Sequence, residues 1–144
     1  MSQDTAASEK QNSPQTPKLC VDTLIDMGAG MIVLIERKNE PHGWALPGGY
    51  VDIGETVEEA AFRECAEECK IEIEIVKQFH VYSDPARDSR GHTASVVFIA
   101  RGHGEPRAAS DAVNIGLFHQ GNLPENICFD HRRIINDYFL EQYR

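Results

Sequence analysis

The sequence predicts an α+β domain, in which strands and helices form layers around one core. Two observations predict strands: residues 71–82 alternate between apolar and polar side chains, and residues 93–103 are almost continuously apolar. A third observation predicts helices, because apolar residues recur at helical spacing in the acidic segment 56–69 and near the C-terminus. The expected order is therefore strands, one acidic helix, more strands and a final helix.

The strands form two groups on either side of the acidic helix. Before it, residues 19–27 and 30–37 are predicted to pair through a turn near Gly28 and Gly30. The short stretch WALPGG, at 44–49, leads into the acidic segment. After the helix we expect strands at 71–82 and 93–103 and a weaker one at 113–119.

Both helices are predicted to be amphipathic. The segment from Thr56 to Cys69 has an apolar stripe made of Phe62, Cys65, Ala66 and Cys69. The C-terminal segment, from about Phe129 to Tyr143, has a stripe made of Ile134, Ile135, Tyr138 and Phe139. We expect each helix to bury its stripe.

The composition fits one soluble domain, with 144 residues, 41% of them hydrophobic, and a mean hydropathy of −0.40. No run approaches the roughly 18 apolar residues of a membrane span, and residues 1–18 lack the apolar core of a signal peptide. We therefore expect a disordered polar tail over 1–18, a single domain over 19–144 and a cytoplasmic location.

Four cysteines are present, and no two of them form a CxxC pair. Because Cys65 and Cys69 share the predicted buried face, reduced core thiols are favoured over a disulfide or a zinc site. The other two are Cys20 and Cys128.

The formal net charge of −9 argues against nucleic-acid binding, which needs a footprint of lysine and arginine. An anionic substrate would also be repelled, unless divalent cations neutralise its binding site. The acidity therefore suggests that a phosphorylated substrate would require metal.

Three carboxylates, Glu64, Glu67 and Glu68, are predicted to converge on the flank of the acidic helix opposite its apolar stripe. Like charges at positions i and i+4 cost roughly 0.2–0.5 kcal/mol on a bare helix. Mg²⁺ or Mn²⁺ would turn this repulsion into coordination, because both prefer oxygen ligands. The alternative is a solvated acidic face, in which Arg63 bridges Glu59 and Glu67.

Residues 49–71 resemble the Nudix hydrolase box. Its pattern is Gly, five residues, Glu, seven residues, Arg-Glu, an aliphatic, any residue, Glu-Glu, any residue, Gly and an aliphatic. Chance agreement over this chain is on the order of one in 10⁵. The matching positions are Gly49, Glu55, Arg63, Glu64, Glu67, Glu68 and Ile71.

Two positions depart from the pattern. Cys65 replaces an aliphatic residue, which is a mild change because free cysteine packs as a small hydrophobe. Lys70 replaces the glycine that would supply a left-handed cap at the helix end. Lysine in that conformation costs about 1 kcal/mol, so we expect an effect on stability rather than on chemistry.

The resemblance implies the Nudix fold, a mixed sheet sandwiched between helices with the box as a loop-helix-loop metal site. It implies that Glu64, Glu67, Glu68 and the carbonyl of Gly49 bind Mg²⁺ or Mn²⁺. Arg63 would orient these ligands through Glu55, which itself would not touch the metal. Taken alone, the Gly48-Gly49 pair would instead be interpreted as a structural turn.

The general base is left open between three acids. Relatives tend to carry an acid in the loop before the last strand, and Asp111 fits that spacing better than Glu105. Asn114 stands where many relatives have glutamate, and an amide cannot accept a proton. The base is therefore Asp111, Glu67 or Glu68.

Residues 81–100 resemble the segment that follows the box in ADP-ribose pyrophosphatases, with Pro85 as the marker. Arg87, Arg90 and His92 would then contact the substrate's diphosphate. Adenine would stack on an aromatic side chain, with Tyr82, Phe79 and Trp44 as the candidates.

Simpler interpretations stand beside these assignments. Arg87 and Arg90 lie among Asp84 and Asp88 and would also form local salt bridges, and Trp44 is also a good core residue.

The expected activity is metal-dependent hydrolysis of a nucleoside diphosphate sugar, with ADP-ribose giving AMP and ribose 5-phosphate. One alternative is a nucleoside triphosphate pyrophosphohydrolase that clears damaged nucleotides. Another is a module that senses ADP-ribose without cleaving it. Neither nucleic acid nor a membrane is an expected partner, and a homodimer is possible because family members often pair.

Overall fold

A computed structural model describes residues 13–109 and 112–143. Its core is a mixed seven-stranded sheet, in which the strand order β3-β2-β1-β6-β5 is extended by β4 beside β1 and β7 beside β2. The strands are β1 Lys18–Asp26, β2 Ile32–Arg37, β3 Gly43–Ala45, β4 Gly48–Tyr50, β5 Glu72–Tyr82, β6 Thr93–His103 and β7 Ala112–Phe118.

Most of the tail predicted over 1–18 lies outside the described residues, as does Asp111. Within the described part, β1 begins at Lys18. All five predicted strands are confirmed. The two three-residue strands, β3 and β4, were not predicted.

β1 positions the site because it changes neighbours along its length. It runs parallel to β6 from Lys18 to Asp26, but it pairs with β2 only at Asp26↔Ile32. Between these strands β4 inserts antiparallel to β1, with Val21 opposite Gly49. The Gly48-Gly49 pair therefore lies in a strand, and its interpretation as a turn is wrong.

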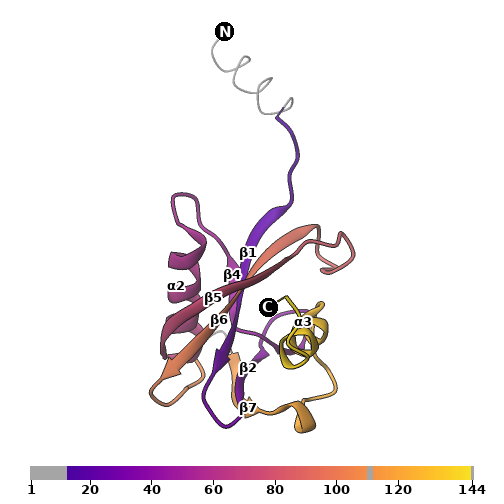
Figure 1. Cartoon of the computed structure of the whole chain (residues 1–144). Coiled ribbons are helices and arrows are strands. Elements are labelled where there is room, and N and C mark those ends of the chain that lie inside the picture. The colour runs from indigo at the N-terminus through magenta and orange to yellow at the C-terminus, as the bar shows by residue number, and fades with distance from the viewer. Residues whose placement is uncertain (1–12, 110–111, 144) are drawn as a thin grey trace.

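The sheet is sandwiched between helices, as the resemblance implied (Figure 1). α2 (Val57–Cys69) covers one face, and its buried residues join an apolar cluster with β1, β2, β5 and β6. α3 (His131–Phe139) covers the other face, where Ile134 and Ile135 are fully buried. A short 3-10 helix, η1 (Gln120–Asn122), precedes α3.

α2 begins and ends where the sequence indicates. The Thr56 hydroxyl accepts a hydrogen bond from the Glu59 backbone, and the Glu59 side chain accepts one from the Thr56 backbone, which makes a capping box. At the other end Lys70 is left-handed, with φ 55° and ψ 36°.

The face that α2 buries differs from the prediction. Ala60, Ala61, Cys65 and Cys69 are buried, whereas Phe62 is 45% exposed and Ala66 is exposed. The helix is rotated so that Glu64 and Glu68 turn inward toward β4. The physical cause of this difference is that the two glycines of β4 leave room for the carboxylates.

α3 is shorter than the predicted 129–143. Phe129 has a φ of 58°, which is incompatible with a helix start there, and Asp130 takes the N-cap position. Tyr138 and Phe139 are partly buried and pack on the core below the helix. All four cysteines are buried free thiols, and Cys65 and Cys69 lie on the buried face of α2 as predicted. Among the described residues, no helix is long and apolar enough to span a membrane.

Candidate functional site

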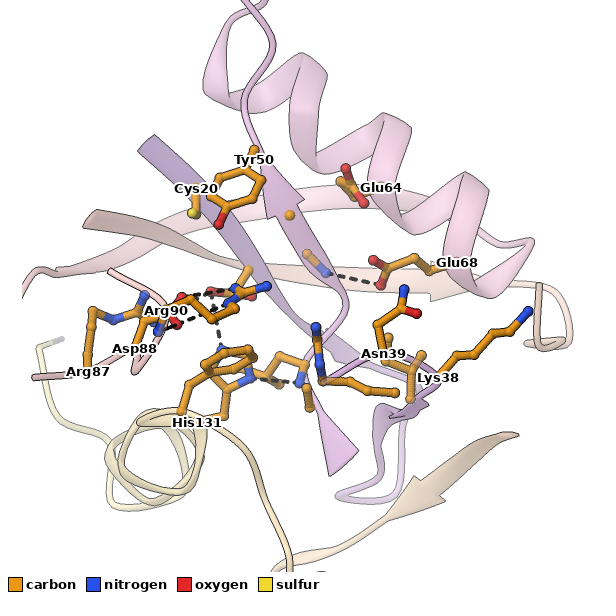
Figure 2. Close-up of a pocket in the computed structure, with 18 residues that line it drawn as sticks. Cys20, Lys38, Asn39, Tyr50, Glu64, Glu68, Arg87, Asp88, Arg90 and His131 are labelled. Atoms are coloured by element: carbon orange, nitrogen blue, oxygen red, sulfur yellow. Dashed lines mark hydrogen bonds and ion pairs between the residues drawn. The ribbon is translucent and has the colours of Figure 1, made fainter. Parts of the chain in front are cut away.

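Two glycines let α2 approach β4. The Gly48 N–H donates to Glu68 Oε2 at 3.2 Å. A Cβ on Gly49 would lie 2.7 Å from Glu64 Oε1, and one on Gly48 would clash with the Val21 carbonyl and the Asp22 carboxylate. Figure 2 shows Glu64 and Glu68 pointing from the helix toward this strand. A larger residue at Gly49 would push the Glu64 carboxylate away, and one at Gly48 would push β4 away from β1.

Arg63 clamps the start of the box to its helix. Its Nε and Nη2 donate to the two oxygens of Glu55 at 2.7 and 2.9 Å, and its Nη1 donates to Glu64 Oε1 at 2.7 Å. Nη2 also donates to the Tyr50 carbonyl at 3.0 Å. This bonding, first of all the contact with Arg63, lowers the pKa of Glu55 to about 2. Arg63 is thus anchored by Glu55, the partner that the family resemblance implied, and holds Glu64 in place.

Burial dominates the electrostatics of the Glu64–Glu68 pair. It raises the pKa of Glu68 well above the usual range, and the neighbouring Glu64 charge adds to this effect. Burial also raises the pKa of Glu64, although Arg63 opposes it. The two partly buried carboxyls interact with each other, and they repel when both are ionised. A divalent cation fits this donor pair, because it would remove the repulsion and prefers oxygen ligands.

The third glutamate does not join the pair. Glu67 is 58% exposed at its side chain and faces Arg63 Nη1 at 3.4 Å. Within residues 13–109 and 112–143, no three metal-ligating side chains are gathered into a cluster. The expected convergence of three carboxylates is therefore corrected to two, with Glu67 on the solvent side because it lies on the outer flank of the rotated helix.

A cavity of about 310 Å³ opens beside this acid pair. Glu64 and Glu68 line one side with Gly48, Gly49 and Tyr50. Arg37, Lys38 and Arg90 are also among its lining residues, so the cavity carries both acidic and basic side chains. Such a combination suits a cation together with a phosphorylated ligand.

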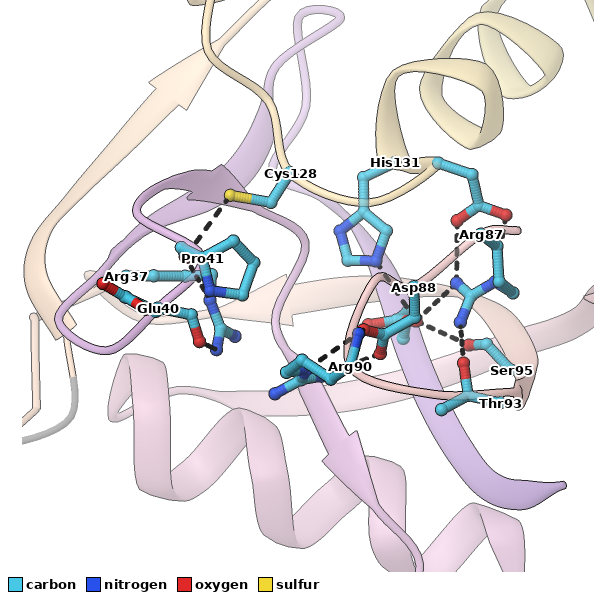
Figure 3. Close-up of polar contacts among 12 residues, drawn as sticks. Arg37, Glu40, Pro41, Arg87, Asp88, Arg90, Thr93, Ser95, Cys128 and His131 are labelled. Atoms are coloured by element: carbon cyan, nitrogen blue, oxygen red, sulfur yellow. Dashed lines mark hydrogen bonds and ion pairs between the residues drawn. The ribbon is translucent and has the colours of Figure 1, made fainter. Parts of the chain in front are cut away.

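Arg87 lines the cavity, but its guanidinium is bound within a buried network (Figure 3). Its Nε and Nη2 bind both oxygens of Asp130, at 3.0 and 2.7 Å, and its Nη1 donates to the Thr93 hydroxyl at 2.6 Å. Since all three nitrogens have protein partners, the predicted contact of Arg87 with a diphosphate is corrected. The salt-bridge partner of Arg87 is Asp130, the N-cap residue of α3, and not the local acids Asp84 and Asp88.

Asp22 and His131 complete this network. The Leu46 N–H donates to His131 Nδ1 at 3.0 Å, so Nε2 carries the proton and lies 3.4 Å from Asp22 Oδ2. The Ser95 hydroxyl donates to the same Asp22 oxygen at 2.5 Å. Through Leu46, α3 is thus tied to the segment that leads into Gly48 and Gly49.

Of the other predicted substrate contacts, Arg90 alone lines the cavity beside the acid pair. Its guanidinium binds both oxygens of Asp88, the local salt bridge that the sequence offered as an alternative, and lies over the Phe129 ring at 4.9 Å. His92 donates from Nε2 to the Ser83 carbonyl and lies outside this cavity. Pro85 is exposed and lines no part of it.

The predicted aromatic platforms are corrected. Tyr82 is 4% exposed and donates its hydroxyl to Asp137 of α3, and Phe79 is 5% exposed in the same core. Trp44 packs edge-on against Phe118 at 5.0 Å, as a core residue would. The aromatic side chains that do line the cavity, Tyr50 and Phe129, were missed.

Sequence reasoning also missed Asp22, Asp88 and His131, which line the cavity. A signal existed for Asp22, because it is a charged residue inside the otherwise apolar stretch LCVDTLI. No local pattern marks His131, because its partners are far away in the sequence.

The match to known proteins agrees with this geometry. The family model of the NUDIX domain matches residues 16–138. The chain belongs to the Nudix family. This Nudix protein is 46% identical over 125 residues to an ADP-ribose pyrophosphatase of Methanocaldococcus jannaschii, an alignment that covers 85% of this chain and 73% of the relative.

A second relative is a Bacillus subtilis protein named as a candidate 8-oxo-dGTP diphosphatase. It is 35% identical over 109 residues, covering 74% of this chain and 70% of the relative. The crystal structure of a MutT NUDIX hydrolase from Burkholderia pseudomallei superposes with a TM-score of 0.77 at 31% identity, covering 85% and 98% of the two chains. The protein is therefore a Nudix hydrolase, and hydrolases of this family generally need divalent metal ions.

Proposed function

We propose that this Nudix hydrolase cleaves the diphosphate linkage of ADP-ribose into AMP and ribose 5-phosphate. The similarity to the archaeal ADP-ribose pyrophosphatase supports this substrate. The observation that carries the proposal is the partly buried Glu64–Glu68 pair, which lies against the Gly48-Gly49 backbone in a cavity that basic side chains also line. This arrangement suits a cation bound between the protein and a diphosphate.

Mg²⁺ or Mn²⁺ would be held by Glu64, Glu67, Glu68 and the Gly49 carbonyl. When bound, the metal would polarise the phosphate oxygens and acidify a water molecule. Glu67 is exposed on the same helix, and its side chain would have to turn away from Arg63 to join the other two. Arg63 keeps Glu64 oriented, with Glu55 as its anchor.

Basic side chains of the cavity would stabilise charge on the substrate. Arg37 and Lys38 offer donors to phosphate oxygens, whose negative charge increases as the diphosphate bond breaks. The water's proton passes to Asp111, Glu67 or Glu68. Of the two candidates that the structure describes, Glu67 has the exposed side chain. Glu68 also accepts a hydrogen bond from the Gly48 N–H.

A substrate assay tests the proposal. ADP-ribose and a set of nucleoside triphosphates are supplied at equal concentration with Mg²⁺ or Mn²⁺, and the release of AMP and of pyrophosphate is measured. We expect AMP from ADP-ribose as the fastest reaction, and its loss when EDTA removes the metal. Faster pyrophosphate release would support the triphosphate hydrolase, and tight ADP-ribose binding without product would support the sensing module.

In the same assay, Glu68→Gln is expected to lower kcat by about 100-fold or more, because a neutral amide is a poor cation ligand. Its melting temperature should not fall, because the amide keeps the size of the side chain and is neutral, as the protonated carboxyl favoured by burial is. Glu58→Gln, at an exposed position in the first turn of the same helix, is the matched control and should keep normal turnover. Normal turnover by Glu68→Gln would exclude the assigned role.

A further inference from the structure

A second cavity, of about 450 Å³, adjoins the one beside the acid pair. The two cavities share Tyr50 and Arg90 as lining residues. Figure 2 shows Tyr50 and Lys38 at opposite ends of the first cavity, so the shared wall lies at one end of the substrate site. A ligand longer than the first cavity would therefore extend past Tyr50 into the second.

The second cavity has the opposite electrostatic character to the chain as a whole. Lys18, Arg90 and His92 line it, and none of its described lining residues is an aspartate or glutamate. This is notable in a protein with a formal net charge of −9. An anionic group would be attracted here, whereas the acidic side chains of the first cavity would repel it in the absence of metal.

Lys18 is available to a ligand. Its ammonium lies 5.2 Å from the centre of the Tyr50 ring, and no carboxylate of the described chain lies within 4.0 Å of it. The backbone of Lys18 is fixed, because its N–H donates to the His92 carbonyl at 3.1 Å where β1 begins beside β6. The side chain therefore starts from a rigid position and ends in a compact ammonium group that can donate hydrogen bonds.

Arg90 is held in place from the other side. Asp88, whose side chain is 3% exposed, binds its Nε and Nη2, and the rings of Phe129 and Tyr50 lie 4.9 and 5.8 Å from the guanidinium carbon. Asp88 lines the first cavity but not the second. Among the described residues Nη1 has no hydrogen-bond partner, so it remains available as a donor.

We propose that the second cavity binds a phosphate monoester carried on the substrate away from the bond that is cleaved. Lys18 and Arg90 Nη1 would contact its oxygens across the face of Tyr50. The preferred substrates would then be nucleoside diphosphate derivatives with a third phosphate on a ribose hydroxyl. This inference rests on the proposed function, because that function places the diphosphate beside Glu64 and Glu68.

Calorimetry with unreactive nucleotides tests the subsite without any need for hydrolysis. AMP is compared with adenosine 2′,5′-bisphosphate and adenosine 3′,5′-bisphosphate, using the full chain in Mg²⁺. We expect one bisphosphate to bind about tenfold or more tightly than AMP, because a charge-assisted hydrogen bond is worth about that factor. Lys18→Gln should abolish this difference, and Lys18→Arg should retain most of it.

Lys77→Gln is the matched control, because it removes the same charge from β5, outside both cavities. It should keep the preference for the bisphosphate. Equal affinity for AMP and both bisphosphates, binding of none of them, or a preference that survives Lys18→Gln would overturn the proposal. A chain that shows the expected preference but hydrolyses no ADP-ribose would refute the proposed function and leave the subsite standing.

Discussion

At the scale of single residues, Lys70 shows how a departure from the family pattern is tolerated. Its backbone takes the left-handed conformation that the missing glycine would adopt, and its N–H still donates to the Ala66 carbonyl at 3.2 Å. The side chain is exposed, so the extra atoms meet no obstacle. What remains is the intrinsic cost of φ 55° for a residue with a Cβ atom.

Lys70→Gly is expected to stabilise the protein by about 1 kcal/mol, because glycine adopts this conformation without steric cost. For a chain of this size that corresponds to an increase in melting temperature of about 3 °C. Calorimetric melting of the wild type and the variant measures it. Lys70→Ala, which removes the charge but keeps the Cβ, should show no increase. A lower melting temperature for Lys70→Gly would show that the cap argument is wrong.

At the scale of elements, the sequence predicted the bounds of α2 but not its rotation. The cap at Thr56 and the end at Lys70 follow from local chemistry, so they could be predicted. A prediction from hydrophobic spacing assumes that every glutamate of the helix faces solvent. It therefore placed Phe62 on the buried face, whereas this side chain is exposed. Glu64 and Glu68 turn inward because the glycines of β4 leave room for them, and this contact between two elements is not visible in the helical pattern of α2 alone.

The Arg63–Glu55 contact predicts a pH dependence of stability. The pKa of Glu55 is lowered from 4.5 to about 2 in the folded chain, mainly by Arg63. Its stabilising contribution is therefore complete above about pH 4.5 and is lost as the pH falls toward 2. Urea unfolding of the wild type and Glu55→Gln across this range should show a difference that narrows on acidification. A difference that stays constant from pH 7 to pH 2.5 would contradict this assignment.

At the scale of the whole molecule, the site depends on contacts between distant parts of the chain. The five longer strands were predictable from their apolar patterns. β3 and β4 were not, because three residues rich in glycine carry no periodicity. The network around Asp22, Arg87 and His131 joins β1, the loop before β6 and α3, so no local pattern could reveal that Arg87 is structural. The sequence indicated the chemistry of the box, whereas the walls of the cavity required the fold.

The most direct test of the central claim is anomalous diffraction from a crystal grown with Mn²⁺, with Glu68→Gln as the comparison. The account predicts a manganese peak between the Gly49 carbonyl and the carboxylates of Glu64 and Glu68, with Glu67 turned toward it, and a weakened or absent peak in the variant. A wild-type crystal in which this position is empty, or in which manganese binds elsewhere on the chain, would contradict it.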